Sequence, residues 1–358
     1  MNKSCMLATK FQSDLMCGKY KVGDRFPCGR VLAKENNASR DTVRRAVEGL
    51  LNKGIIRKKG GRGGFVVDRI PGAPSSIGVL VSGCRYSEIF PVISASVHKC
   101  AKAAGYSVVS GDASVLKVGM TGAKVLTMAK RMIKEGVKGV VMQPVEFTSD
   151  FLKINAEIVN LFDKAGIPVV LVDCDIVRIP ARSGRDVVGI DNFGAGCAIG
   201  RHLMDLGVKR IAFIARRYCA DSVNCRLAGV RHAVGNVPVD FVAVSDFGDG
   251  DAIGKVLRRL VCVDAIVCQN DVAAVKVAET LERMGLAIPR DVKLAGFDGV
   301  GLFAKMHPAL TTVRQPCEEI GRIAFERLAA RLSGDASSAM VIAPGAELVI
   351  GGSTTILQ

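Results

Sequence analysis

The sequence predicts an α/β protein in two parts: a small N-terminal domain of helices ending in a β-hairpin, and a body of two lobes with doubly wound parallel sheets. Three observations support this. Residues 1–70 hold 16 Lys and Arg against 6 Asp and Glu, contributing +10 of the chain's net charge of +15. Residues 68–76 interrupt all periodicity with two prolines, a glycine and two serines. From residue 77, short Val/Ile/Leu runs alternate with helical stretches, as in parallel sheets covered on both faces.

Composition narrows the classes of function. The twelve cysteines include no Cys-x-x-Cys pair, and only four histidines are present, so we expect free thiols, no metal site and no cofactor. No apolar run is long enough to span a bilayer, and residues 1–10 lack the apolar core of a secretory signal. We therefore expect a cytoplasmic protein without a membrane partner. The concentrated positive charge of residues 1–70 points to a polyanion as the partner of the N-terminal domain.

A helix is predicted over residues 39–53, with Ser39 as its N-cap. Its apolar positions follow helical spacing and form one stripe, made of Val43, Ala46, Val47, Leu50 and Leu51. The opposite face carries Arg40, Asp41, Arg44 and Arg45. Such a face suits a helix that inserts its N-terminal end into a DNA groove, although an ordinary solvated basic face has the same pattern. The neighbouring segments decide between these two interpretations.

Helices are also predicted over residues 6–16 and from Gly29 or Arg30 to Glu35, and residues 36–38 form the turn before the third helix. This order is that of a helix-turn-helix. Two strand-like segments, 55–59 and 65–67, flank the glycine-rich residues 60–64, which predicts a hairpin whose tip presents Arg62 to a minor groove. A phosphate-binding loop is the alternative for these glycines, but no Gly-Lys-Ser or Gly-Lys-Thr follows them.

These segments carry a resemblance to the winged-helix headpiece of GntR-type bacterial repressors, over residues 5–67. Its landmarks are Gly23-Asp-Arg-Phe-Pro27, Leu32-Ala33, Ser39-Arg-x-Thr-Val-Arg44, Gly54-Ile-Ile56 and Gly61-Arg-Gly-x-Phe-Val66. The resemblance implies that Arg30 and Thr42 bind phosphates, that Arg40 and Arg44 read base edges, and that Arg62 acts in the wing. The full expected DNA-binding set is Arg30, Ser39, Arg40, Asp41, Thr42, Arg44, Arg45, Lys58 and Arg62. Asp41 either accepts a hydrogen bond from cytosine or orients Arg44 or Arg45. The family usually has Pro-Ser-Glu-Arg where this chain has Pro27-Cys-Gly-Arg30.

In the body, strands are predicted over residues 77–82, 107–110, 139–143, 168–173, 187–191, 210–215, 241–244, 265–269 and 293–297. Ligands of doubly wound folds bind beyond the carboxyl ends of such strands. Polar residues follow several of these ends, namely Asp173, Asp191, Asn270, Asp271 and Asp298, and Arg226 lies near the start of a helix. Together they can bond several hydroxyl groups, as a sugar or polyol requires. For Asp191 and Asp271 we favour the simpler role of helix N-cap.

The body also resembles the effector domain of LacI/GalR repressors, which are related to periplasmic sugar-binding proteins. The matching motifs are Val188-Gly-Ile-Asp-Asn192, Arg226-x-x-Gly229, Gln269-Asn-Asp-x-Ala-Ala274, Gly296-Phe-Asp298 and Pro308-Ala-Leu-Thr-Thr-Val-Arg-Gln-Pro316. The resemblance implies a ligand between two lobes that three chain passages connect. It implies that Asp173, Arg226, Asn270 and Asp298 bond the ligand and that Phe247 stacks on it. The family often has Arg-x-Ser-Thr where this chain has Gly351-Gly-Ser-Thr354.

The expected domains are therefore residues 1–67, a linker over 68–76, and an effector-binding and dimerisation domain over 77–358. One lobe should hold about 77–188 and 314–338, and the other about 189–313 and 339–358. A GntR-type headpiece on a LacI-type body resembles the arabinose-type regulators of bacteria. The expected function is that of a sequence-specific transcription regulator, a repressor rather than an enzyme, which binds a double-stranded operator as a homodimer and responds to a sugar or polyol.

Three other functions compete for the same body. An NAD(P)-dependent oxidoreductase would use the glycines Gly194, Gly196 and Gly200, but their spacing departs from the dinucleotide motif and no acidic residue ends the next strand. A hydrolase is disfavoured because there is no Gly-x-Ser-x-Gly motif. A free sugar-binding protein would carry a secretory signal and no basic headpiece, and we expect neither condition to hold.

Overall fold

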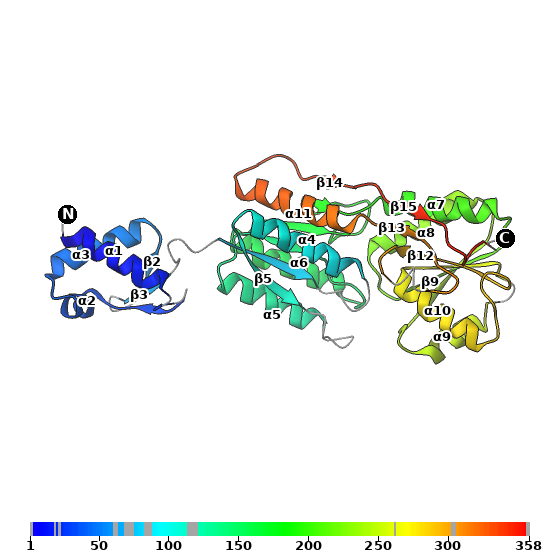
Figure 1. The fold of residues 1–358 in the computed structure, drawn as a ribbon, viewed down its shortest axis with the longest axis horizontal. Coiled ribbons are helices and arrows are strands. Elements are labelled where there is room, and N and C mark those ends of the chain that lie inside the picture. The colour runs from blue at the N-terminus through cyan, green and yellow to red at the C-terminus, as the bar shows by residue number, and fades with distance from the viewer. Residues whose placement is uncertain are drawn as a thin grey trace. The chain divides into compact units, whose positions relative to one another are not determined.

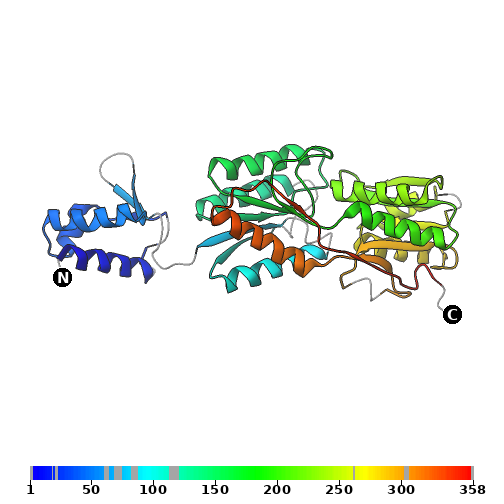
Figure 2. The same ribbon diagram turned by 90° about the horizontal axis from the view of Figure 1, so that it is seen from above.

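A computed structural model provides the fold of this chain. It describes residues 3–17, 19–20, 23–59, 64–67, 75–81, 88–112, 121–260, 263–301 and 306–355. The chain forms two compact units, the first ending at Ser76 and the second beginning at Ile77 (Figures 1 and 2). Within the described ranges, no helix combines the length and the apolar character that a membrane-spanning segment requires.

The first unit contains three helices and a small antiparallel sheet. Its elements are α1 (Lys3–Met16), β1 (Arg25–Phe26), α2 (Gly29–Glu35), α3 (Arg40–Asn52), β2 (Ile56–Lys59) and β3 (Gly64–Val67), with strand order β1-β3-β2. α3 ends where Gly54 adopts a φ of +62°, which lets Ile55 N–H bond the carbonyl of Leu50. The predicted apolar stripe faces inward, because Val43 and Leu50 are fully buried against Phe11 and Leu15 of α1. The unit is thus a helix-turn-helix followed by a hairpin, as the sequence predicted.

The first lobe of the second unit is a six-stranded sheet with strand order β14-β8-β7-β6-β4-β5. The strands are β4 (Ser76–Val81), β5 (Ser107–Asp112), β6 (Val140–Met142), β7 (Val169–Val172), β8 (Val187–Val188) and β14 (Val341–Ile342). Its helices are α4 (Ile89–Ala103), α5 (Thr121–Lys134), α6 (Phe151–Lys164) and α11 (Cys317–Leu332). The pairs β4–β6, β6–β7, β7–β8 and β8–β14 are parallel.

The second lobe has a second six-stranded sheet with strand order β10-β9-β11-β12-β13-β15. The strands are β9 (Ile211–Arg216), β10 (Val239–Val244), β11 (Ala265–Cys268), β12 (Lys293–Asp298), β13 (Thr311–Arg314) and β15 (Glu347–Val349), and only β15 pairs antiparallel. Its helices are α7 (Asn192–Asp205), α8 (Asp221–Val234), α9 (Gly250–Leu257) and α10 (Asp271–Arg283). The predicted fold class, two lobes with mostly parallel sheets, is confirmed.

One predicted lobe boundary is wrong. Residues from 339 onward were expected in the second lobe, but Val341 pairs with Val187 of β8 in the first lobe. The cause is the buried carboxylate of Asp186, which accepts the N–H of Met340 at 2.8 Å and bonds Arg331 of α11 at 2.8 Å. The chain therefore passes between the lobes at residues 189–191, 315–316 and 343–346.

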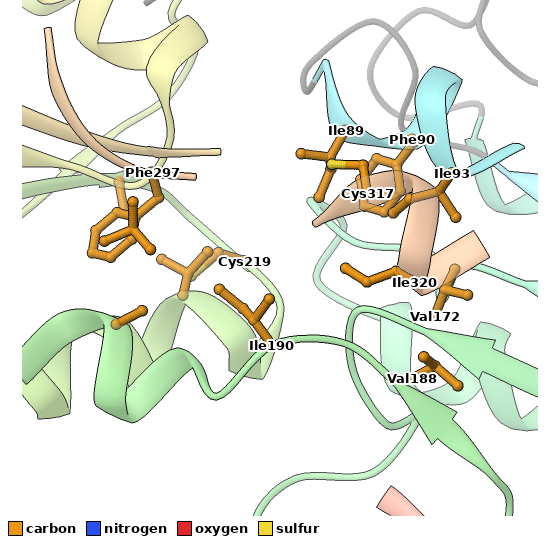
Figure 3. Close-up of a cluster of buried hydrophobic side chains, with 14 of the residues drawn as sticks. Ile89, Phe90, Ile93, Val172, Val188, Ile190, Cys219, Phe297, Cys317 and Ile320 are labelled. Atoms are coloured by element: carbon orange, nitrogen blue, oxygen red, sulfur yellow. The ribbon is translucent and has the colours of Figure 1, made fainter. Parts of the chain in front are cut away.

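Buried apolar side chains from both lobes belong to one cluster (Figure 3). The first lobe contributes Ile89, Phe90, Ile93, Val172, Val188, Cys317 and Ile320, and the second contributes Cys219 and Phe297. Ile190 lies on the first passage between the lobes and is 7% exposed. This apolar packing fixes the strand ends around which the polar residues of the body gather.

Candidate functional site

A cavity lies between the lobes, where the carboxyl ends of strands from both sheets meet. It is lined by Ile89, Phe90, Glu146, Phe147, Asp173, Ser222, Val223, Arg226, Gln269, Asn270 and Asp298. The structure thus brings together four of the five residues that the sequence nominated for the ligand. They come from the ends of β7, β11 and β12 and from the first turns of α8.

Phe247, the fifth nominated residue, lies elsewhere. It is 8% exposed and packs in the core of the second lobe with Ile214, Ile253 and Leu257. The structure therefore does not bring Phe247 to the cavity, because the apolar neighbours after β10 bury its ring. Two other rings, Phe90 and Phe147, line the cavity instead.

Arg226 is the most constrained side chain of the cavity. It is 4% exposed, and its Nε donates to Asn192 Oδ1 at 2.8 Å while its Nη1 donates to the carbonyl of Gln269 at 2.7 Å. The same Nη1 lies 3.7 Å from Asp298 Oδ1, and the guanidinium stacks 4.8 Å from the ring centroid of Phe297. These partners belong to several elements, and together they hold the guanidinium in one orientation at the cavity wall.

The residues at the start of α10 have different roles from those the sequence suggested. Asn270 caps the helix by accepting the N–H of Ala273 at 3.0 Å. Asp271 is not the cap; its buried carboxylate accepts Thr312 Oγ1 at 2.7 Å and Gly299 N–H at 2.8 Å, and burial raises its pKa. Asp191 caps α7, as predicted, by accepting the N–H of Gly194 at 2.9 Å.

Glu146 is a cavity residue that sequence reasoning missed. It follows β6 by four residues, so the same search beyond strand ends would have found it with a wider window. Its Oε2 accepts the N–H of Ala220 at 3.3 Å and its Oε1 lies 3.4 Å from Gln143 Nε2. The residue as a whole is only half-buried, but its carboxyl group lies between the lobes. The loss of water around the carboxyl group and the nearby Asp173 carboxylate raise the pKa of Glu146 to about 8.

Strained backbone surrounds the cavity. Phe147, Asp173, Tyr218 and Asp298 have positive φ values of 66°, 74°, 57° and 117°. Such conformations cost residues other than glycine about 1–3 kcal/mol each. They persist where many surrounding contacts hold the backbone in place. Across the lobes, Phe147 N–H donates to the carbonyl of Tyr218 at 2.8 Å. Positive-φ backbone and cavity-lining side chains therefore coincide at Phe147, Asp173 and Asp298.

The lobes are closed on each other. Ser222 Oγ of the second lobe donates to Asp173 Oδ2 of the first at 2.9 Å, and Arg178 Nη1 donates to Asp221 Oδ1 at 2.9 Å. The cavity between them has a volume of about 30 Å³. Pockets for small organic ligands are roughly 300–1,000 Å³. A ligand of that class therefore requires the lobes to move apart before it enters.

Two of the glycines considered for a dinucleotide turn, Gly196 and Gly200, serve the packing of α7 on α8. Gly194, Gly196 and Gly200 lie inside α7, which begins at Asn192. A Cβ at Gly196 would collide with the backbone of Arg226 in α8, and one at Gly229 would collide with the backbone of Phe193. These glycines let α7 and α8 approach closely. None of them forms a loop after a strand, which the dinucleotide motif requires.

In the first unit, the nominated DNA-binding residues lie mainly on the exposed face of α3. Ser39 caps this helix by accepting the N–H of Thr42 at 3.1 Å, and the two hydroxyls are 2.7 Å apart. The side chains of Arg30, Arg40, Arg44, Arg45 and Lys58 are exposed. Arg62 lies outside the described residues. Asp41 accepts from Arg44 Nη2 at 2.6 Å and is 3.3 Å from Arg45 Nη2.

Metal binding finds no support here: in the described ranges, no three His, Cys, Asp or Glu side chains are grouped so that they could hold an ion. The fold and the cavity define the body as a two-lobed α/β domain with a polar cavity at the lobe interface. This is the structural class that the geometry alone establishes.

Comparisons with known proteins extend this assignment. Residues 201–354 match the family model described as "Periplasmic binding protein-like domain". The HTH-type transcriptional regulator GntR of Escherichia coli K12 is 26% identical over 301 residues, which cover 81% of this chain and 86% of that protein. The ribose operon repressor of the same strain is 29% identical over 174 residues, 47% of this chain and 52% of that protein.

A solved LacI family transcriptional regulator from Enterococcus faecium, with bound ribose, superposes with a TM-score of 0.64 at 20% identity, over 79% of this chain and 100% of that chain. Residues 201–354 are therefore similar to a periplasmic-binding-protein-like domain, and the fold of the body is similar to that of a solved LacI family transcriptional regulator. The relatives named above are transcriptional regulators. The E. coli protein called GntR is itself a LacI-family protein, so its name does not bear on the headpiece.

Proposed function

We propose that this chain is a sequence-specific DNA-binding transcription regulator, a repressor, whose operator affinity is controlled by a small sugar or polyol bound between the lobes of its body. One observation carries the proposal: the same chain has a basic helix-turn-helix unit and a body similar to those of known regulators, with a polar cavity between its lobes. The proposed domains are residues 1–67, a linker over 68–76 and the body over 77–358.

The DNA-binding half of the proposal rests on the first unit. α3 buries its apolar stripe and exposes Arg40, Arg44 and Arg45, so its guanidinium groups are free of the core. Guanidinium groups bond guanine edges in a major groove and phosphates beside it. Lys58 on β2 belongs to the predicted wing. The resemblance of this unit to GntR-type headpieces supports the same role.

The effector half rests on the cavity. Asp173, Glu146 and Asp298 supply acceptor oxygens, while Arg226 and Asn270 supply donors, and two aromatic rings provide an apolar face. A polyhydroxy compound both donates and accepts at each hydroxyl and therefore suits such a mixture. The bound ribose of the Enterococcus faecium regulator fits the same class of ligand. We further propose that two copies pair and place two α3 helices on the half-sites of a palindrome.

Selection of binding sites from random double-stranded DNA tests this function on the full chain. We expect enrichment of one twofold-symmetric sequence. Arg44→Ala should then cost about 1–3 kcal/mol at one base position, whereas Lys58→Ala should weaken all sequences alike and reduce the salt slope by about one. If no sequence is enriched, the chain is not a sequence-specific regulator. Equal losses on selected and random DNA for both variants would remove Arg44 from base reading.

A further inference from the structure

The first two turns of α3 carry one acidic residue among their basic ones. Asp41 is the only acid in the first two turns of the helix, which also hold Arg40, Arg44 and Arg45. The helix does not need it as a cap, because Ser39 already accepts the N–H of Thr42. The apolar face does not need it either, since its side chain is 55% exposed.

The geometry joins Asp41 to both following arginines. Its Oδ1 accepts from Arg44 Nη2 at 2.6 Å and from Arg44 Nε at 3.2 Å, and its Oδ2 lies 3.3 Å from Arg45 Nη2. The carboxylate holds one edge of the Arg44 guanidinium, and these bonds lower the pKa of Asp41. The Nη1 hydrogens and the outer Nη2 hydrogen form the other edge of that guanidinium. This is the fork that bonds the O6 and N7 atoms of guanine.

The same carboxylate acts on DNA in a second way. Phosphates repel a negative charge whatever the base sequence, and affinity for DNA of any sequence depends on the net charge that the protein presents. Asp41 therefore opposes binding to every duplex. This repulsion is offset where Arg44 bonds its guanine. There the Arg44 side chain is already ordered before the DNA binds, so less conformational entropy is lost on binding.

We propose that Asp41 is a specificity-determining positioning residue: it orients Arg44 for a guanine edge and, by its charge, lowers affinity for DNA of other sequences. This inference rests on the proposed function, because it requires that α3 reads DNA. It goes beyond that function by assigning selectivity to an acid that does not itself bond a base.

Three variants of the full chain test the inference, with DNA affinities measured on the selected operator, on that operator with single guanines replaced, and on a scrambled duplex. Asp41→Asn should bind scrambled DNA at least about threefold more tightly, with a salt slope steeper by about one. It should also discriminate about tenfold less well at the guanine that Arg44 reads. Asp41→Glu keeps the charge but moves the carboxylate, so it should leave scrambled DNA affinity unchanged and still weaken guanine discrimination.

Asp14→Asn is the matched control, because Asp14 on α1 also pairs with a basic residue, Lys19, at 3.3 Å. It removes the same charge and should leave the ratio of operator to scrambled affinity as in the wild type. Thermal unfolding establishes that each variant is folded. An unchanged ratio in Asp41→Asn, or an equal fall in Asp14→Asn, overturns the inference. A wild-type chain that selects no operator contradicts the proposed function instead.

Discussion

At the scale of single residues, Glu146 has the most testable chemistry. Its carboxyl group lies between the lobes, and burial together with the Asp173 carboxylate raises its pKa from an ordinary value of 4.5 to about 8. Glu146 thus carries a proton at neutral pH in the closed form. A protonated carboxyl group donates a hydrogen bond, which an ionised one cannot do. Near neutral pH, the carboxyl O–H of Glu146 is therefore an additional hydrogen-bond donor in the closed cavity.

The stability of the body should depend on pH through this group. Between pH 4.5 and 8, the native state holds a proton that the unfolded chain has lost, so the free energy of unfolding falls as pH rises and levels off above 8. The slope is at most about 1.4 kcal/mol per pH unit. We expect the melting temperature of the wild type to fall relative to that of Glu146→Gln from pH 5 to pH 8.5.

The difference between the two proteins isolates Glu146, because other shifted groups such as Asp173 and Asp271 are common to both. Asp163→Asn is a suitable control, since this carboxylate is half-exposed and pairs with Arg185 at 2.6 Å at the surface. Its melting curve should run parallel to that of the wild type at every pH. Parallel curves for Glu146→Gln would show that the carboxyl group ionises normally.

Sequence reasoning brought residues together correctly where one physical rule applied. Asp173, Asn270 and Asp298 were found because parallel strands bring their carboxyl ends to one edge of a sheet. Glu146 escaped because it lies four residues past its strand, and Phe247 was misplaced because a strand-end position does not tell which way a ring packs. The role of Asp271 was also missed. Both Asn270 and Asp271 can cap a helix, and only the tertiary contacts with Thr312 and Gly299 separate them.

At the scale of elements, α3 depends on its N-terminal cap. The Ser39 hydroxyl satisfies a backbone N–H that would otherwise lack a partner in the helix. Ser39→Ala should cost about 1 kcal/mol of helix stability. Amide hydrogen exchange in the full chain should therefore be about fivefold faster over α3 when exchange proceeds through local opening.

Ser13→Ala provides the control for this change. Ser13 is an exposed residue in the interior of α1, where alanine is favoured over serine. Exchange over α1 should be unchanged or slower in that variant. If Ser39→Ala leaves α3 exchange at the wild-type rate, the hydroxyl does not cap the helix in solution.

Elements with strong periodicity were predictable, whereas two of the shortest strands, β1 and β14, were not. The helix over residues 39–53 was expected from its apolar spacing, and the structure has it over Arg40–Asn52. β1 and β14 have two residues each, too few for any alternation to register. β14 exists because it pairs with β8 and because Asp186 bonds Met340, contacts separated by about 150 residues in the sequence. Local patterns carry no information about such pairs.

At the scale of the whole molecule, the proposed function requires that an effector bound in the second unit change DNA binding by the first. Arg226 is central to this, since it joins α8 to Asn192 of α7 and to the carbonyl of Gln269 beyond β11. We expect the sugar or polyol that most raises the melting temperature of the wild-type protein also to change the affinity of that protein for its operator. The same compound should change neither the melting temperature nor the operator affinity of Arg226→Ala. A ligand at 100 times its dissociation constant adds about 2.7 kcal/mol of stability.

Asp298→Asn should reproduce the loss with a smaller change in packing. Arg210→Ala, which breaks a pair with Asp240 at 3.0 Å away from the cavity, should respond to the ligand as the wild type does. Operator affinity without ligand should be the same in all of these variants. A normal response in folded Arg226→Ala and Asp298→Asn would put the effector site elsewhere.

The number of chain passages has a consequence for how such a protein can arise. Three passages tie the lobes together, with β14 and β15 returning to different sheets near the end of the chain. No single crossover between two genes could exchange one lobe and leave the other whole. The first unit joins the body through one stretch of chain, so a single crossover within residues 68–76 would transfer it intact. Under the proposed function, recombination can therefore give an existing effector response a new set of target genes in one event, whereas a new cavity has to be built by substitution.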